Sequence, residues 1–138
     1  GAGVLGWDWF ALRLDDGREL MAYLLRRADG SVHPVSSGTL VERDGRATHL
    51  PLSAFTCTAE RTWTSPHSGA TYPARWRIRV PQAALELEVA ARTPDCELDG
   101  RASTGVIYWE GPVAVTGSAT GTGYAELTGY AGSLARRF

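Results

Sequence analysis

The chain has 138 residues, of which 43% are hydrophobic, and its 14 cationic and 15 anionic side chains give a formal net charge of −1. This length suits one domain that buries about two thirds of its unfolded surface. The balanced charge argues against a nucleic-acid partner, and no apolar run approaches the roughly 18 residues of a membrane span. We expect a single soluble domain over residues 1–138, cytoplasmic or exported as part of a longer precursor.

Residues typical of metal, cofactor and disulfide chemistry are sparse. Cys57 and Cys96 fit two separate thiols better than a disulfide, which stays the alternative. His33, His49 and His67 lack the short-spaced partners of a zinc site. We therefore expect no metal and no cofactor. All basic side chains are Arg, and Lys and Asn are absent, a bias that indicates a GC-rich, bacterial coding sequence.

Turn signals such as Asp-Gly recur along the chain at short spacing and separate segments with β-type alternation. No segment has a convincing helical period. Eight or nine antiparallel strands form either a closed barrel or a sandwich, and we favour an all-β antiparallel barrel. The expected strands are residues 6–15, 18–27, 36–43, 46–56, 58–64, 73–80, 84–91, 104–116 and 123–130.

The first hairpin contains a carboxylate among aromatic residues, in Gly6-Trp7-Asp8-Trp9-Phe10. A two-residue type I′ turn at Asp16-Gly17 would place Phe10 opposite Tyr23 and Asp8 opposite Leu25. Because side chains alternate along a strand, Asp8, Phe10 and Tyr23 then share an apolar, inward face.

Burial would make Asp8 a candidate acid, because desolvation disfavours a charged carboxylate and raises its pKa. Two structural alternatives stay open: Asp8 bonds backbone N–H groups or an Arg, or it lies in an interdomain seam. Trp7 and Trp9 fall on the more mixed face, which indicates a docking surface for another domain or subunit.

Two later hairpins carry further candidates. A loop at residues 81–84 pairs Trp76 with Val89 on an apolar face and Arg77 with Glu88 on a charged face. Exposed ion pairs of this kind explain the arginines better than an anion site does.

In the last hairpin, a loop at residues 117–123 brings two polar and aromatic faces together. This face would either line a ligand site or form an outward surface or interface. Its members are Tyr108, Glu110, Tyr124, Glu126 and Tyr130.

Several motifs, taken in order, resemble the lipocalin-like proteins grouped with AttH and with hydroxyneurosporene synthase, the carotenoid 1,2-hydratase. They cover nearly the whole chain. The motifs are Gly-Trp-Asp-Trp-Phe (6–10), Leu-Asp-Asp-Gly-Arg-Glu-Leu-Met (14–21), Ser-Ser-Gly-Thr-Leu (36–40), Trp-Thr-Ser-Pro (63–66), Tyr-Pro-Ala-Arg-Trp (72–76), Tyr-Trp-Glu-Gly (108–111) and Gly-Tyr-Ala-Glu-Leu-Thr-Gly-Tyr (123–130).

The resemblance implies a lipocalin-like β-barrel, the second half of a two-barrel protein, and an apolar unsaturated ligand such as a polyene or isoprenoid. Two departures from the family pattern are Cys96, where Gln is expected, and the lack of a His near Trp7 and Trp9. Hydratase activity, a Diels-Alder type cyclase, a non-catalytic carrier and a structural half supporting the missing domain all stay open.

For an enzyme, a raised-pKa acid beside aromatic faces suits protonation of a double bond. Asp8 and Tyr23 are the candidate catalytic residues. The candidate ligand-binding residues are Phe10, Trp76, Tyr108, Glu110, Tyr124 and Glu126.

Overall fold

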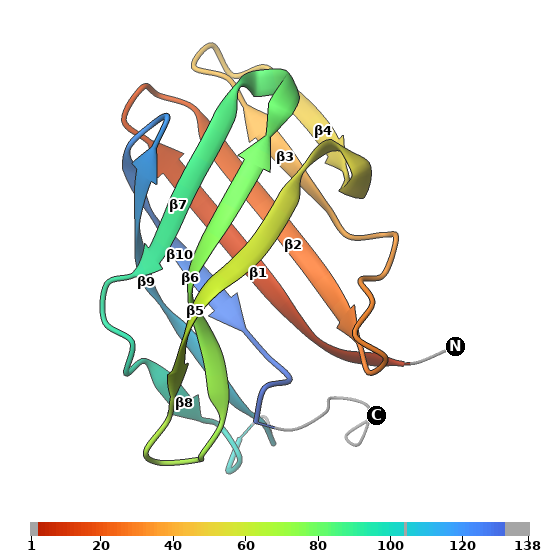
Figure 1. The fold of residues 1–138 in the computed structure, drawn as a ribbon, viewed down its shortest axis with the longest axis vertical. Coiled ribbons are helices and arrows are strands. Elements are labelled where there is room, and N and C mark those ends of the chain that lie inside the picture. Colours follow the sequence, from red (N-terminus) through yellow and green to blue (C-terminus); the bar gives the residue numbers. More distant parts are fainter. Residues whose placement is uncertain (1–2, 104, 132–138) are drawn as a thin grey trace.

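The computed structural model describes residues 3–103 and 105–131, which form one curled antiparallel sheet (Figure 1). The hydrogen-bonded order is β4-β3-β2-β1-β10-β9-β7-β6-β5, and β8 pairs with β9. The all-β prediction is therefore confirmed, in the form of a half-barrel. The strands are β1 (Val4–Leu14), β2 (Glu19–Arg27), β3 (Ser37–Val41), β4 (Ala47–Pro51), β5 (Thr56–Thr64), β6 (Thr71–Val80), β7 (Leu85–Ala91), β8 (Glu97–Asp99), β9 (Ile107–Gly117) and β10 (Gly121–Leu127).

Two short 3₁₀ turns, η1 (Leu52–Ala54) and η2 (Pro81–Ala83), interrupt this sequence of strands. Within the described part of the chain, no helix has the length and apolar character to cross a membrane.

The predicted register of the β1–β2 hairpin is wrong by one residue. Leu14 N–H donates to the Arg18 carbonyl oxygen over 2.9 Å, and Gly17 adopts a φ of 93°. The loop therefore has three residues, 15–17, with glycine in the left-handed region. Because a slip of one residue exchanges the faces of a strand, Tyr23 pairs with Trp9 on the outer face instead of with Phe10.

The β6–β7 hairpin has the predicted pairings, whereas the predicted loop of the β9–β10 hairpin at residues 117–123 is too long, because Gly121 already pairs with Val115. In β6–β7, Trp76 lies opposite Val89 and Arg77 opposite Glu88. In β9–β10, Glu110 lies directly opposite Glu126, so the two polar faces coincide as expected. The short strand β8 was not predicted from the sequence.

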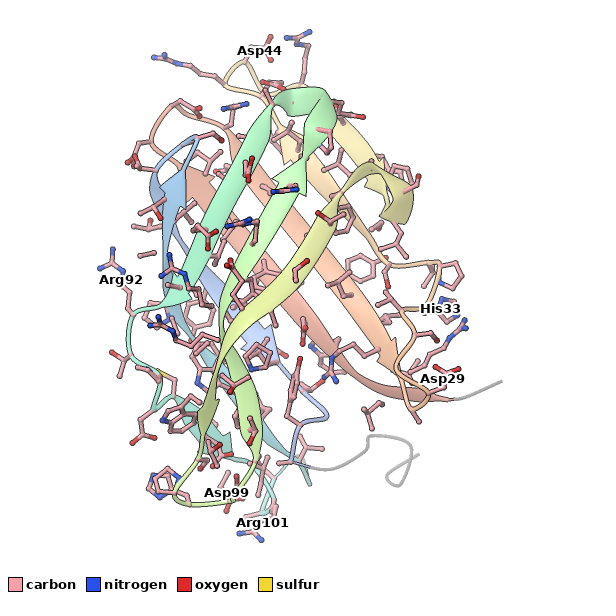
Figure 2. The ribbon with its side chains drawn as sticks, in the orientation of Figure 1. Asp29, His33, Asp44, Arg92, Asp99 and Arg101 are labelled. Carbon is pink, nitrogen blue, oxygen red and sulfur yellow. The ribbon has the colours of Figure 1, made fainter. Side chains whose placement is uncertain are left out.

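The core fills the space that the curled sheet encloses. Figure 1 shows β5, β6 and β7 crossing in front of β1 and β2, and the rings of Phe10 and Trp76 meet edge to face at 5.0 Å between these two walls. Both side chains are 1% exposed. Side chains crowd the interior in Figure 2, whereas the labelled charged residues, among them Arg92 and Asp99, lie at its periphery.

Candidate functional site

Asp8 faces inward from β1 and is only 6% exposed, as predicted. The Tyr130 hydroxyl donates to its carboxylate at 2.8 Å from Oδ1 and 3.1 Å from Oδ2. Arg26, from β2, places its Nε 3.3 Å from Oδ1. We call Asp8, Arg26 and Tyr130 the inner cluster.

The chain segment after β10 holds Tyr130 over Asp8. Thr128 and Trp7 exchange two hydrogen bonds: Thr128 N–H to the Trp7 carbonyl oxygen at 2.9 Å, and Trp7 N–H to Thr128 Oγ1 at 3.0 Å. Gly129, at a φ of 84°, then turns the chain inward. The backbones approach so closely that a Cβ on Gly6 would lie 2.1 Å from the Thr128 carbonyl oxygen.

Burial dominates the electrostatics of the inner cluster. It raises the pKa of Asp8 above its ordinary value, and the charge of Arg26 and the hydrogen bond from Tyr130 offset only part of this effect. Burial and the Asp8 charge also raise the pKa of Tyr130 and bring that of the Cys57 thiol to about 12. Tyr130 and Cys57 therefore stay protonated at neutral pH.

Arg26 has partners besides Asp8. Its Nη2 donates to the Thr128 carbonyl oxygen, and its Cζ lies 3.8 Å from the centre of the Tyr130 ring, a cation–π contact. Neither of these two partners depends on the charge of Asp8, and the Arg26 side chain is 18% exposed.

The predicted site residues divide between the two faces of the sheet. Asp8, Phe10 and Trp76 lie inside, and Phe10 and Trp76 are packed core residues. Tyr23 bonds the Val35 carbonyl oxygen at 3.1 Å, on the opposite face from Asp8. The remaining predicted residues share this outer face of the sheet and are Trp7, Trp9, Tyr108, Glu110, Tyr124 and Glu126.

The outer face also carries an open groove of about 410 Å³. Ala11, Met21, Val41 and Tyr124 contribute its apolar lining. Nearby on the same face, Trp7 Nε1 donates to Glu126 Oε1 at 3.3 Å. Sequence alternation predicted that Tyr124 and Glu126 share a face with Tyr108 and Glu110, but it predicted neither the Trp7–Glu126 contact nor the groove.

Sequence reasoning allowed for an Arg bonded to Asp8 but did not identify it as Arg26, and it missed the position of Tyr130. The incorrect hairpin register placed Arg26 on the outer face, and Tyr130 was grouped with Tyr108 and Tyr124. The Gly before Tyr130, which permits the left-handed turn, was the available signal that the strand ends there.

The described residues hold neither a cluster of metal-ligating side chains nor a disulfide. In residues 3–103 and 105–131, no group of three or more His, Cys, Asp or Glu side chains could hold a metal ion. Cys57 and Cys96 are free thiols.

The curled antiparallel sheet defines a lipocalin-like class of protein. A model of the AttH-like family matches residues 1–130, and the chain belongs to this family. None of the curated proteins matches it.

Two solved structures are similar. An AttH protein from Nitrosomonas europaea has 37% identity and a TM-score of 0.83 over 92% of this chain. Kievitone hydratase from Nectria haematococca has 20% identity and a TM-score of 0.71 over 91% of the chain, a likeness in fold. This chain spans 39% of the length of each.

Proposed function

We propose that this domain is part of a cofactor-independent hydratase that binds an apolar, unsaturated small molecule, a polyene or isoprenoid. The observation that carries the proposal is the buried carboxyl of Asp8, whose pKa is raised and which has a hydroxyl donor at 2.8 Å. Membership of the AttH-like family and the fold shared with kievitone hydratase support the same reaction class.

In the proposed reaction, protonated Asp8 transfers its proton to one carbon of the double bond. The neighbouring carbon becomes a cation, a water molecule adds to it, and the added oxygen returns a proton to the Asp8 carboxylate. Tyr130 and Arg26 stabilise the carboxylate between these two transfers. The net change is the addition of one water to the ligand, with Asp8 regenerated.

The ligand would reach Asp8 from the end of the half-barrel where Arg26 and Tyr130 are half-buried. Tyr130 takes the position beside the acid that the sequence had suggested for Tyr23. Phe10 and Trp76 support this end from the core instead of contacting the ligand directly.

The outer face suits the partner expected from the sequence, a second lipocalin-like half or subunit. Trp7 and Trp9 lie on the same face of the sheet as the groove, and both solved relatives have more than half of their length outside the matched region. In this arrangement, the partner would cover the groove. Truncation to the present chain would then increase hydrogen exchange in the central residues of β1 relative to the complete protein.

The groove also supports a second candidate function, a non-catalytic carrier. Its apolar lining residues could hold the same class of ligand on the outer face. In this case, Met21→Gln would weaken ligand binding, whereas Asp8→Asn would not.

The enzyme proposal is tested with Asp8→Asn in the intact protein. Asp99→Asn is the matched control, because Asp99 is an exposed carboxylate paired with Arg101 at 2.7 Å (Figure 2). Kievitone and a linear polyene serve as probes, and mass spectrometry detects the gain of one water. We expect Asp8→Asn to lower turnover by about 10²–10⁴-fold and Asp99→Asn to leave it unchanged. Equal turnover in Asp8→Asn, or no hydration of either probe by the wild type, would overturn the proposal.

A further inference from the structure

A second polar group, centred on the half-buried Glu97 of β8, lies next to the inner cluster. Three hydroxyls donate to its carboxylate: Ser65 at 2.7 Å, Ser68 at 2.5 Å and Tyr72 at 2.8 Å. Although burial raises the pKa of Glu97, the hydrogen bonds from Ser68, Ser65 and Tyr72 hold it below its ordinary value. The carboxylate is therefore a charged acceptor that fixes all three donors.

The donors come from one stretch of chain. Ser65 and Ser68 lie in the loop between β5 and β6, and Tyr72 is near the start of β6. Ser65 is 2% exposed, and its Oγ also accepts the N–H groups of His67 and Ser68, so the loop is rigidly held. The charge of His67, which pairs with Asp95 at 3.5 Å on the surface, also lowers the pKa of Glu97.

Tyr72 connects this group to the inner cluster. Its side chain has no exposed surface, and its ring stacks on Trp63 at 6.2 Å. The same ring meets Tyr130 at 5.5 Å, and Tyr130 donates to Asp8. A continuous series of contacts therefore runs from Glu97 through Tyr72 and Tyr130 to Asp8.

We propose that Glu97 is a positioning residue: by anchoring the Tyr72 hydroxyl, it fixes the ring of Tyr130 and thereby the hydrogen bond from Tyr130 to Asp8. A charge-assisted bond suits this role because it is shorter and stronger than a neutral one. The inference deepens the proposed function, since it assigns a support to the acid of the same site. The proposed role of Glu97 also assigns a function to β8, which adds only three residues to the sheet.

The test measures the Asp8 carboxyl directly by ¹³C NMR titration of the full chain. The variants are Glu97→Gln and Tyr72→Phe, which keeps the ring and removes only the hydroxyl. Tyr130→Phe gives the shift for complete loss of the hydrogen bond to Asp8, and Asp95→Asn is a nearby control outside the series of contacts. Circular dichroism checks that each variant is folded.

Because the hydrogen bond from Tyr130 lowers the pKa of Asp8, its loss should move the titration midpoint upward. We expect Glu97→Gln and Tyr72→Phe to reproduce roughly half or more of the Tyr130→Phe shift, and Asp95→Asn to produce none. Folded Tyr72→Phe with the wild-type midpoint would overturn the inference, even if Glu97→Gln failed to fold.

The titration midpoint of Asp8 is measured independently of turnover. Equal turnover in Asp8→Asn would refute the hydratase while leaving the titration valid. If the hydratase is correct, Tyr72→Phe should lower kcat more than it changes KM, because Tyr72 has no exposed surface and would act only through Tyr130.

Discussion

The two faces of β1 present similar residue types in different environments. Inside, Asp8 and Phe10 are at most 6% exposed and have defined neighbours from β2, β6 and the segment after β10. Outside, Trp7 and Trp9 are half-buried on the face of the sheet that carries the groove. One ligand cannot contact both faces, so the proposed acid chemistry inside the half-barrel and the proposed contact with a partner or ligand outside it are separate hypotheses.

The largest effect should come from the inner face. We expect Phe10→Ala to lower the free energy of unfolding by about 3–5 kcal/mol, because it leaves a cavity against Trp76. Chemical denaturation measures this loss. Trp9→Ala, one residue along the same strand, is the control and should cost less than half as much. Equal losses would show that the two faces do not differ in packing.

The pH dependence of stability should reveal the environment of Asp8. A carboxyl whose pKa is raised on folding binds protons more tightly in the folded state, so its contribution to stability falls as pH rises from its ordinary value of 3.8 through the raised pKa. Wild type should therefore gain stability relative to Asp8→Asn as pH is lowered through this window, by at most about 1.4 kcal/mol per pH unit. Parallel denaturation curves across the window would contradict this expectation.

The smallest effect should come from the charged outer surface of β6 and β7. Arg79 and Glu86 pair at 2.9 Å, with side chains 50% and 58% exposed. Arg79→Gln should cost only about 0.2–1 kcal/mol, and less at high salt, because water screens the pair. A larger loss in denaturation experiments would mean that the pair is shielded from water.

Local sequence signals were enough to predict the register of the β6–β7 hairpin but not that of the β1–β2 hairpin. The alternation of apolar and charged residues fixed the β6–β7 register, since a slip would bury Arg77 and Glu88. In β1–β2, Asp16-Gly17 fits both a two-residue loop and a three-residue loop with glycine in the left-handed conformation. The inward direction of Asp8 was predictable because it depends on alternation within one strand, but its cross-strand partner was not.

The inner cluster could be predicted only in part. Asp8 stands out in the sequence as a carboxylate among aromatic residues. Its partners Arg26 and Tyr130 are 18 and 122 residues away along the chain, and tertiary folding brings them together. The contribution of Glu97 depends on a three-residue strand, which is too short to show alternation.

The most direct measurement is the titration of Asp8 in the wild-type protein. A ¹³C-carboxyl NMR titration, with the Asp8 signal assigned by its loss in Asp8→Asn, gives the midpoint for this single group. The buried acid described here requires a midpoint above the ordinary value of 3.8. A midpoint at or below 3.8 would show that Arg26 and Tyr130 outweigh burial, and Asp8 would then be a permanently charged structural partner instead of a proton donor.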